Sequence, residues 1–191
     1  MVLRLLAFCL SVTYAGLGYA LIAWKYQNFT RLGPRERNLL VALHLWIVFS
    51  NVTVFAGWVI HDYRLGSWHP FPLAGFGLFL AGSALILWAL ARLRSATFVP
   101  SAETPLTEGP YAWVRHPVYA GGILAAFGLA YAAGSVWILS YAAVVAVLLH
   151  WVSRSEEVEL IRRYGEAYRV YARGKGRFVP ISRPVTEDSR P

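Results

Sequence analysis

Residues 109–122 read GPYAWVRHPVYAGG, so a glycine-proline turn signal and an Arg-His-Pro triplet lead directly into an apolar run. Proline is favoured at the first position of a helix, where its missing N–H costs nothing, and we therefore expect a helix to begin at Pro117. A residue that precedes proline is pushed out of helical geometry. The backbone of Arg115 and His116 should stay outside the helix, with its polar groups free at the membrane face.

Two apolar segments, residues 117–133 and 134–153, follow this corner with almost no loop between them. Such closeness predicts an antiparallel helical hairpin. The hairpin returns the chain to its starting side, where a second polar cluster begins at Glu156 and Glu157 and continues in the tyrosines of residues 164–171. We expect the two polar clusters to meet at one membrane surface and the chemistry to lie there.

The composition of the 191-residue chain indicates a polytopic membrane protein. Hydrophobic residues make up 57% of the chain and charged residues only 15%, and the mean hydropathy is +0.46. Three more apolar runs, at residues 5–24, 39–60 and 72–91, are each long enough to cross a hydrocarbon core of about 30 Å. We predict an all-α fold in which residues 1–191 form a single integral membrane domain with five transmembrane helices.

The polar region after residue 153 predicts an amphipathic helix on the same surface. Ser155 is a favourable helix cap, and Glu156 and Glu157 suit the first turn. Apolar and tyrosine side chains then recur at spacings of three and four as far as residue 171. We therefore expect a cytosolic helix at about residues 155–173 and a disordered tail at residues 181–191.

Basic residues set the expected orientation in the membrane. Five spans place 16 of the 18 Lys and Arg residues on one side and only Arg4 and Arg64 on the other. By the positive-inside rule, the N-terminus then lies outside and the C-terminus in the cytosol. Arginine supplies 16 of these 18 residues, a preference that fits a GC-rich genome, and we expect the inner membrane of a bacterium.

Charge and cysteine content exclude several kinds of partner. The net charge of +8 lies in the loops and tail between apolar runs, so anionic membrane lipids are expected partners and nucleic acid is not. Cys9 is the single cysteine, and no set of histidines and acids has ligand spacing, so neither a disulfide nor a metal is expected. Oligomeric state stays open, because the glycines of residues 72–91 can pack helices within one chain or between two.

The side chains around the corner can together hold a zwitterionic small molecule. The Glu156–Glu157 pair and the faces of Tyr111 and Tyr119 suit a cation. Arginine and free backbone N–H groups suit a carboxylate. The residue chemistry alone leaves a second interpretation open, in which these arginines and tyrosines only anchor the chain at the bilayer surface.

A family resemblance adds to this interpretation. The pattern L-T-x-G-P-Y-x-x-V-R-H-P-x-Y-x-G at residues 106–121, the hairpin, and the pattern E-E-x-x-L-x-x-x-[FY]-G-x-x-Y-x-x-Y at residues 156–171 together resemble the isoprenylcysteine carboxyl methyltransferase and phospholipid methyltransferase superfamily. The resemblance covers about the last 90 residues. It implies S-adenosylmethionine as cofactor and S-adenosylhomocysteine as product, in a pocket formed by the hairpin and the C-terminal helix without a Rossmann domain.

The resemblance also implies which residues contact the cofactor. Glu103 matches less well than the others, and Arg115 belongs to the same Arg-His-Pro triplet. The implied cofactor-binding residues are Glu103, Leu106, Tyr111, Arg115, His116, Pro117, Val118, Tyr119 and Glu156.

The methyl acceptor is implied to be lipophilic and to come from the bilayer. Members with the isoprenylcysteine activity carry an arginine four residues before the cofactor glutamate; here that position is Val152, and Arg154 is the candidate to reach the same space. A carboxylate or thiolate acceptor needs no base, whereas a phospholipid amine must lose a proton, for which Glu157 or His116 is a candidate if unengaged. The predicted catalytic residues are Arg154 and Glu157.

Several functions therefore stay open. The leading hypothesis is methyl transfer like that of isoprenylcysteine carboxyl methyltransferases, to a prenylated or other lipophilic acceptor. The main alternative is N-methylation of a phospholipid of the phosphatidylethanolamine type, and a small thiol is a further possible acceptor. A sterol-type membrane reductase and a non-enzymatic protein with a structural Arg-His-Pro corner are remoter alternatives.

Overall fold

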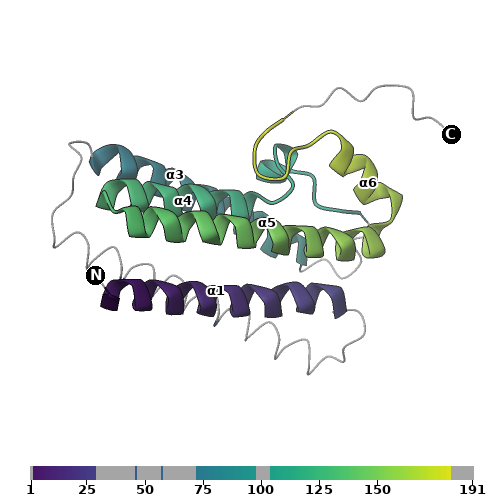
Figure 1. Ribbon diagram of the computed structural model, residues 1–191. Coiled ribbons are helices and arrows are strands. Elements are labelled where there is room, and N and C mark those ends of the chain that lie inside the picture. Colours follow the sequence, from purple (N-terminus) through teal and green to yellow (C-terminus); the bar gives the residue numbers. More distant parts are fainter. Residues whose placement is uncertain (1, 29–45, 47–56, 58–71, 98–103, 182–191) are drawn as a thin grey trace.

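The computed structural model describes residues 2–28, 46, 57, 72–97 and 104–181 of the chain. Within these residues the elements are all helical, which confirms the predicted all-α class (Figure 1). The predicted span at 39–60 apart from residues 46 and 57, the predicted contact residue Glu103, and all but the first residue of the predicted tail lie outside the described residues. The elements are α1 (Val2–Asn28), α3 (Pro72–Thr97), the 3-10 turn η2 (Gly109–Ala112), α4 (Pro117–Ala133), α5 (Val136–Tyr164) and α6 (Glu166–Arg173).

Three of the described helices, α1, α3 and α5, are long and apolar enough to cross a membrane. They match the predicted spans, and the chain is an integral membrane protein. The shorter apolar helix α4 has 17 residues, or about 26 Å, and has the predicted bounds. Helix α5 has 29 residues, or about 43 Å, which exceeds a hydrocarbon core of about 30 Å. The part of α5 from Arg154, its first charged residue, therefore extends beyond the membrane.

Helices α3 and α4 pack with their backbones in direct contact. A Cβ atom added to Gly82 would lie 2.5 Å from the carbonyl oxygen of Gly121, and one added to Gly75 would lie 2.5 Å from that of Gly128. These glycines are needed because any side chain would push the helices apart. Two of the three glycines noted in residues 72–91 thus pack within one chain, whereas Gly77 has no atom within 4 Å of its added Cβ.

We expect Gly82→Ala to destabilise the protein while Gly77→Ala does not. The added methyl group at residue 82 overlaps the backbone of α4, and overpacking typically costs about 1–3 kcal/mol. At residue 77 the same change meets open space, and alanine is the better helix former by up to about 1 kcal/mol. Thermal unfolding of the two variants in detergent measures the difference. Equal unfolding temperatures would contradict the α3–α4 contact.

The hairpin of α4 and α5 is confirmed. Helix α4 is capped by Gly134, whose φ of 60° is a left-handed conformation that favours glycine. The next helix is capped by Ser135, whose hydroxyl accepts a hydrogen bond from the Ile138 N–H at 3.4 Å.

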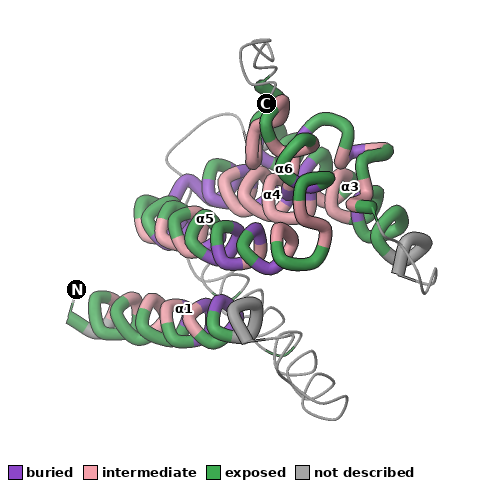
Figure 2. The backbone as a smooth tube through the Cα atoms, turned by 90° about the vertical axis from the view of Figure 1, so that its right-hand side faces the viewer, coloured by how far each residue is buried: buried purple, intermediate pink, exposed green. Residues whose placement is uncertain are grey.

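Helix α1 lies beside α5 (Figure 2). The core between α1 and α5 includes Ala15, Tyr19, Ile22, Leu149 and Val152.

The predicted start of a new helix at Ser155 is wrong. Ser155 is buried inside α5, which continues without interruption to Tyr164. The break comes at Gly165, with a φ of 57°, and α6 begins at the next residue. Between residues 136 and 164 the sequence has no glycine or proline, so the cap and charge signals at Ser155 are too weak to end a helix that has begun.

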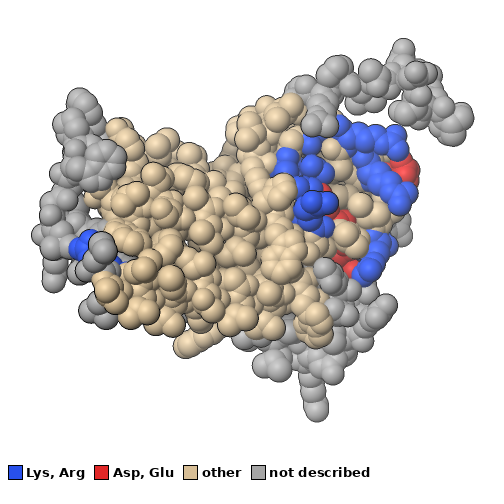
Figure 3. Space-filling model, viewed as in Figure 1, with Lys and Arg blue, Asp and Glu red and all other residues tan. Residues whose placement is uncertain are grey.

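The described helices bring the polar clusters to one end of the bundle. The C-terminal ends of α3 and α5 and the N-terminal end of α4 lie together there (Figure 1). Figure 3 shows most of the visible Lys and Arg side chains gathered at this end, beside the tan body of residues other than Lys, Arg, Asp and Glu. This arrangement agrees with the predicted single polar surface.

Candidate functional site

A pocket with a volume of about 290 Å³ lies at the polar end of the bundle. Its size is near the lower limit of typical small-molecule sites. Side chains from α3, the segment before α4, the start of α4, α5 and α6 line it. They are Leu90, Leu93, Pro105, Leu106, Tyr111, Arg115, His116, Pro117, Val118, Tyr119, Glu156, Leu160, Tyr164, Tyr168 and Tyr171. Apart from Glu103, which lies outside the described residues, every residue predicted to bind the cofactor lines this pocket.

The corner before α4 has the predicted geometry but not the predicted free N–H groups. His116 has φ −128° and ψ 67°, which is not helical, and α4 begins at Pro117 as expected. However, the Arg115 N–H donates to the Gly176 carbonyl and the His116 N–H to the Arg177 carbonyl, both at 3.0 Å. The chain after α6 thus occupies these two donors, which are not free to bind an anion in the pocket.

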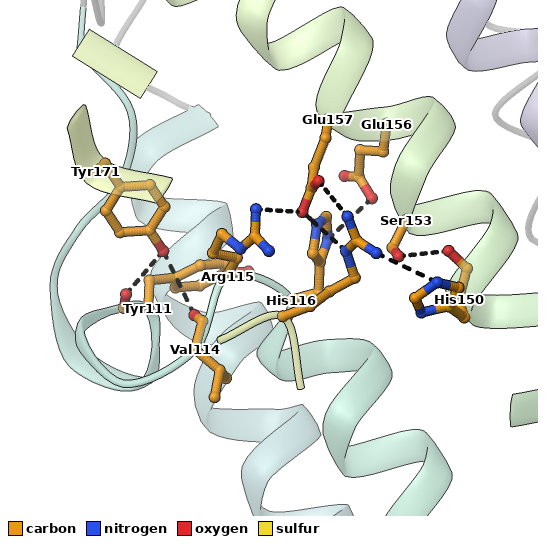
Figure 4. Close-up of polar contacts among 10 residues, drawn as sticks. Tyr111, Val114, Arg115, His116, His150, Ser153, Glu156, Glu157 and Tyr171 are labelled. Atoms are coloured by element: carbon orange, nitrogen blue, oxygen red, sulfur yellow. Dashed lines mark hydrogen bonds and ion pairs between the residues drawn. The ribbon is translucent and has the colours of Figure 1, made fainter. Parts of the chain in front are cut away.

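Glu157 lies at the centre of a cluster of positive side chains (Figure 4). Its Oε1 accepts hydrogen bonds from His116 Nε2 and Arg177 Nε, both at 3.1 Å, and lies 3.1 Å from a terminal nitrogen of Arg115. Its Oε2 accepts from the Arg177 guanidinium at 2.6 Å. Burial favours the neutral carboxyl, but the hydrogen bonds from His116 and Arg177 and the charge of Arg115 outweigh it and lower the pKa of Glu157 to about 2.

His116 is held between two carboxylates. Its Nε2 donates to Glu157, its Nδ1 lies 3.4 Å from Glu156 Oε2, and its ring stacks on Tyr119 at 5.5 Å. Burial lowers the pKa of the imidazole, but the contacts with the Glu156 and Glu157 carboxylates more than offset it, so the pKa lies above its ordinary value. The cluster therefore favours the imidazolium form.

Neither predicted catalytic residue lines the pocket. Arg154 is exposed, and Val152, which takes the position of the superfamily's arginine, is 1% exposed in the core against α1. The prediction that Glu157 or His116 acts as a base required an unengaged group, and both are engaged. A carboxyl group with a pKa of about 2 is also a very weak base at neutral pH.

Three buried polar atoms of pocket residues have no hydrogen-bond partner: Arg115 Nε, Tyr168 Oη and Glu156 Oε2. The contact of the last atom with His116 Nδ1 at 3.4 Å is an ion pair without hydrogen-bond geometry. An unmet buried group of this kind costs about 1–3 kcal/mol. Two donors and one carboxylate oxygen are complementary to a ligand that carries both an anionic and a cationic group, as an amino-acid zwitterion does.

Sequence reasoning placed the C-terminal helix at the pocket but missed the contribution of the chain beyond it. Tyr168 and Tyr171 belong to the second polar cluster that was expected at this surface, and both line the pocket. The Tyr171 hydroxyl donates to the Tyr111 carbonyl at 2.8 Å and so ties α6 to η2. The tyrosine spacing was a usable signal for these two residues, whereas Arg177 stands in a basic segment that gave none.

Comparison with known proteins identifies relatives of the chain. The family model described as phospholipid methyltransferase matches residues 71–167. Methanethiol S-methyltransferase 1 of Bradyrhizobium diazoefficiens is 30% identical over 178 residues, which cover 91% of this chain and 54% of that protein. This chain thus spans about half the length of that relative. No solved structure gives a significant match.

Proposed function

Since the chain belongs to the phospholipid methyltransferase family, we propose that it transfers a methyl group from S-adenosylmethionine to an acceptor that arrives through the membrane. The observation that carries this proposal is the set of unpartnered polar atoms in the pocket. They fit the amino-acid part of this donor, whose ammonium and carboxylate groups need an acceptor and donors at the same place. We further propose that the pocket faces the cytosol of a bacterial cell, with the N-terminus of the chain outside.

Each unpartnered atom has a proposed role. Glu156 binds the ammonium group of the donor, and Arg115 and Tyr168 bind its carboxylate. The faces of Tyr111 and Tyr119 favour a positive sulfonium by cation–π attraction. When bound, S-adenosylmethionine supplies an electrophilic methyl group; the protein's contribution is to orient it and to exclude water behind leucine and proline side chains.

We propose a small thiol, reacting as its thiolate, as the acceptor. The relative from Bradyrhizobium diazoefficiens is named for methanethiol. A thiolate needs no base, and His116, held between two carboxylates, is not poised to accept a proton. Burial and the charge of Glu156 raise the pKa of Tyr111 to about 12, so that its phenol stays neutral. A phospholipid amine, for which the family is named, is the second candidate acceptor.

Methyl-transfer assays with labelled donor test this proposal and separate the acceptors. The full chain in lipid nanodiscs is offered a small alkyl thiol, phosphatidylethanolamine or a prenylated cysteine, one at a time. We expect label in the thioether product. Label in the phospholipid or in the cysteine ester would replace the thiol as acceptor, and no transfer to any acceptor by the folded protein would contradict the methyltransferase proposal.

Tyr168→Phe is expected to weaken donor binding without destabilising the protein. Tyr168 is 2% exposed, its hydroxyl has no partner, and burial followed by the charge of Glu157 raises its pKa. Removing this hydroxyl should lower affinity for S-adenosylmethionine at least about tenfold, because one hydrogen bond to a charged group contributes about 1.5–3 kcal/mol. Calorimetric titration measures the affinity and thermal unfolding the stability. A lower unfolding temperature with unchanged affinity would show that the hydroxyl is structural.

A further inference from the structure

The chain beyond α6 returns to the pocket corner as a short strap, residues 174–178. Val114 and Gly176 form an isolated parallel bridge. The strap carbonyls of Gly176 and Arg177 accept the N–H groups of Arg115 and His116, and Lys175 Nζ donates to the Ala112 carbonyl at 2.8 Å. A side chain at Gly176 would collide with the Val179 carbonyl. The strap is thus fixed by its backbone against the residues that enter α4.

The strap places Arg177 directly on Glu157. The guanidinium grips both carboxylate oxygens, with Nε to Oε1 at 3.1 Å and a terminal nitrogen to Oε2 at 2.6 Å. Only about a fifth of the Arg177 side chain is exposed, at 20%. A two-point contact of this kind fixes the plane of a carboxylate as well as its position. Arg177 does not itself line the pocket.

Glu157 connects Arg177 to His116, which lines the pocket. The oxygen that Arg177 Nε contacts also accepts the hydrogen bond from His116 Nε2. This bond sets the rotation of the imidazole, so that Nδ1 faces Glu156 and the ring lies on Tyr119. Phe178, the next strap residue, adds an edge contact to the same ring at 6.3 Å. The chain of contacts therefore runs from Arg177 through Glu157 and His116 to the carboxylate that lines the pocket.

We infer that Arg177 is a positioning residue of the donor site, which acts through Glu157 to orient His116 and Glu156. The inference rests on the proposed function, because the ligand it concerns is the methyl donor. It assigns to the strap a role in donor affinity rather than only in holding the C-terminus in place.

A double-mutant cycle on the full chain tests whether Arg177 acts through Glu157. Arg177→Gln, Glu157→Gln and the combined variant are titrated with S-adenosylmethionine by calorimetry. We expect Arg177→Gln to weaken binding roughly tenfold or more. The combined variant should bind no more weakly than Glu157→Gln alone, because each single substitution already removes the Arg177–Glu157 contact. Arg177→Lys should bind the donor more tightly than Arg177→Gln but more weakly than wild type, since an ammonium cannot form the two-point contact with both oxygens of Glu157.

Arg173→Gln is the matched control. Arg173 lies four residues earlier, and its ion pair with Glu166 at 2.9 Å is exposed and away from the pocket, so its loss should leave affinity unchanged. Wild-type affinity in Arg177→Gln, or losses that add in the combined variant, would overturn the inference while leaving the proposed function standing. If Arg177→Gln does not fold, wild-type affinity in Arg177→Lys overturns it equally. No binding by the folded wild-type protein would overturn both proposals.

Discussion

Glu156→Gln is expected to weaken binding of S-adenosylmethionine by about a hundredfold, which corresponds to about 2.7 kcal/mol. Glu156 lines the pocket, and its Oε2 is buried without a hydrogen-bond partner. An amide keeps the shape but loses the charge that a cationic group requires, and charge-assisted hydrogen bonds are about twice as strong as neutral ones. Calorimetric titration of the purified protein measures the change.

Glu159→Gln provides the control for this prediction. Glu159 lies three residues further along α5 and its buried Oε2 also has only an ion pair, at 3.6 Å from Arg162, but Glu159 does not line the pocket. Its replacement should leave the affinity within about threefold of wild type, as expected for a weak pair near the surface. Equal effects of the two substitutions would contradict the assignment of Glu156 to the donor site.

Glu157→Ala is expected to produce the largest loss of stability in the chain. Removing this carboxylate leaves Arg115, His116 and Arg177 as neighbouring positive groups with their shared anion gone. Breaking a buried ion pair by removing one partner typically costs about 3–5 kcal/mol. Thermal unfolding at neutral pH should therefore show a much lower transition than for wild type. An unchanged transition would mean that the cluster contributes nothing to the fold.

The same carboxylate predicts a specific pH dependence. The pKa of Glu157 falls from 4.5 to about 2 in the folded protein, so its stabilisation is complete above pH 4.5 and is lost as the pH falls towards 2. The unfolding temperatures of wild type and Glu157→Gln should differ at neutral pH and converge through this interval. A difference that stays constant down to about pH 2 would contradict the lowered pKa.

Local signals in the sequence sufficed for the hairpin and for much of the pocket. Pro117 fixes where α4 begins, Gly134 ends it in a left-handed conformation, and the short connection leaves α5 no path but back along α4. Residues 106–119 and Glu156 then meet because the two helix ends are adjacent. This meeting could be predicted from the path of the chain alone, without the positions of individual side chains. The leucine contributions of α3 depend on how whole helices dock, and sequence spacing alone did not give them.

The engagement of Glu157 could not be predicted from the sequence, because its partners come from two separate parts of the chain. Arg177 lies 20 residues after Glu157 and His116 lies 41 residues before it. Nothing periodic links these positions, and the strap that carries Arg177 follows two turns of chain at Gly165 and Gly174. The continuation of α5 past Ser155 has the opposite cause: the local cap signal was present, but no residue before Gly165 stops the helix.

Ultraviolet cross-linking of S-adenosylmethionine with a radioactive methyl group, followed by mapping of the labelled peptides, tests the position of the donor site most directly. We predict saturable labelling that S-adenosylhomocysteine competes away, confined to peptides from residues 104–119 and 156–171, which carry the pocket tyrosines. Competed label in α1, or elsewhere away from these peptides, would contradict the assigned pocket. The absence of any competed label on the folded protein would contradict it equally.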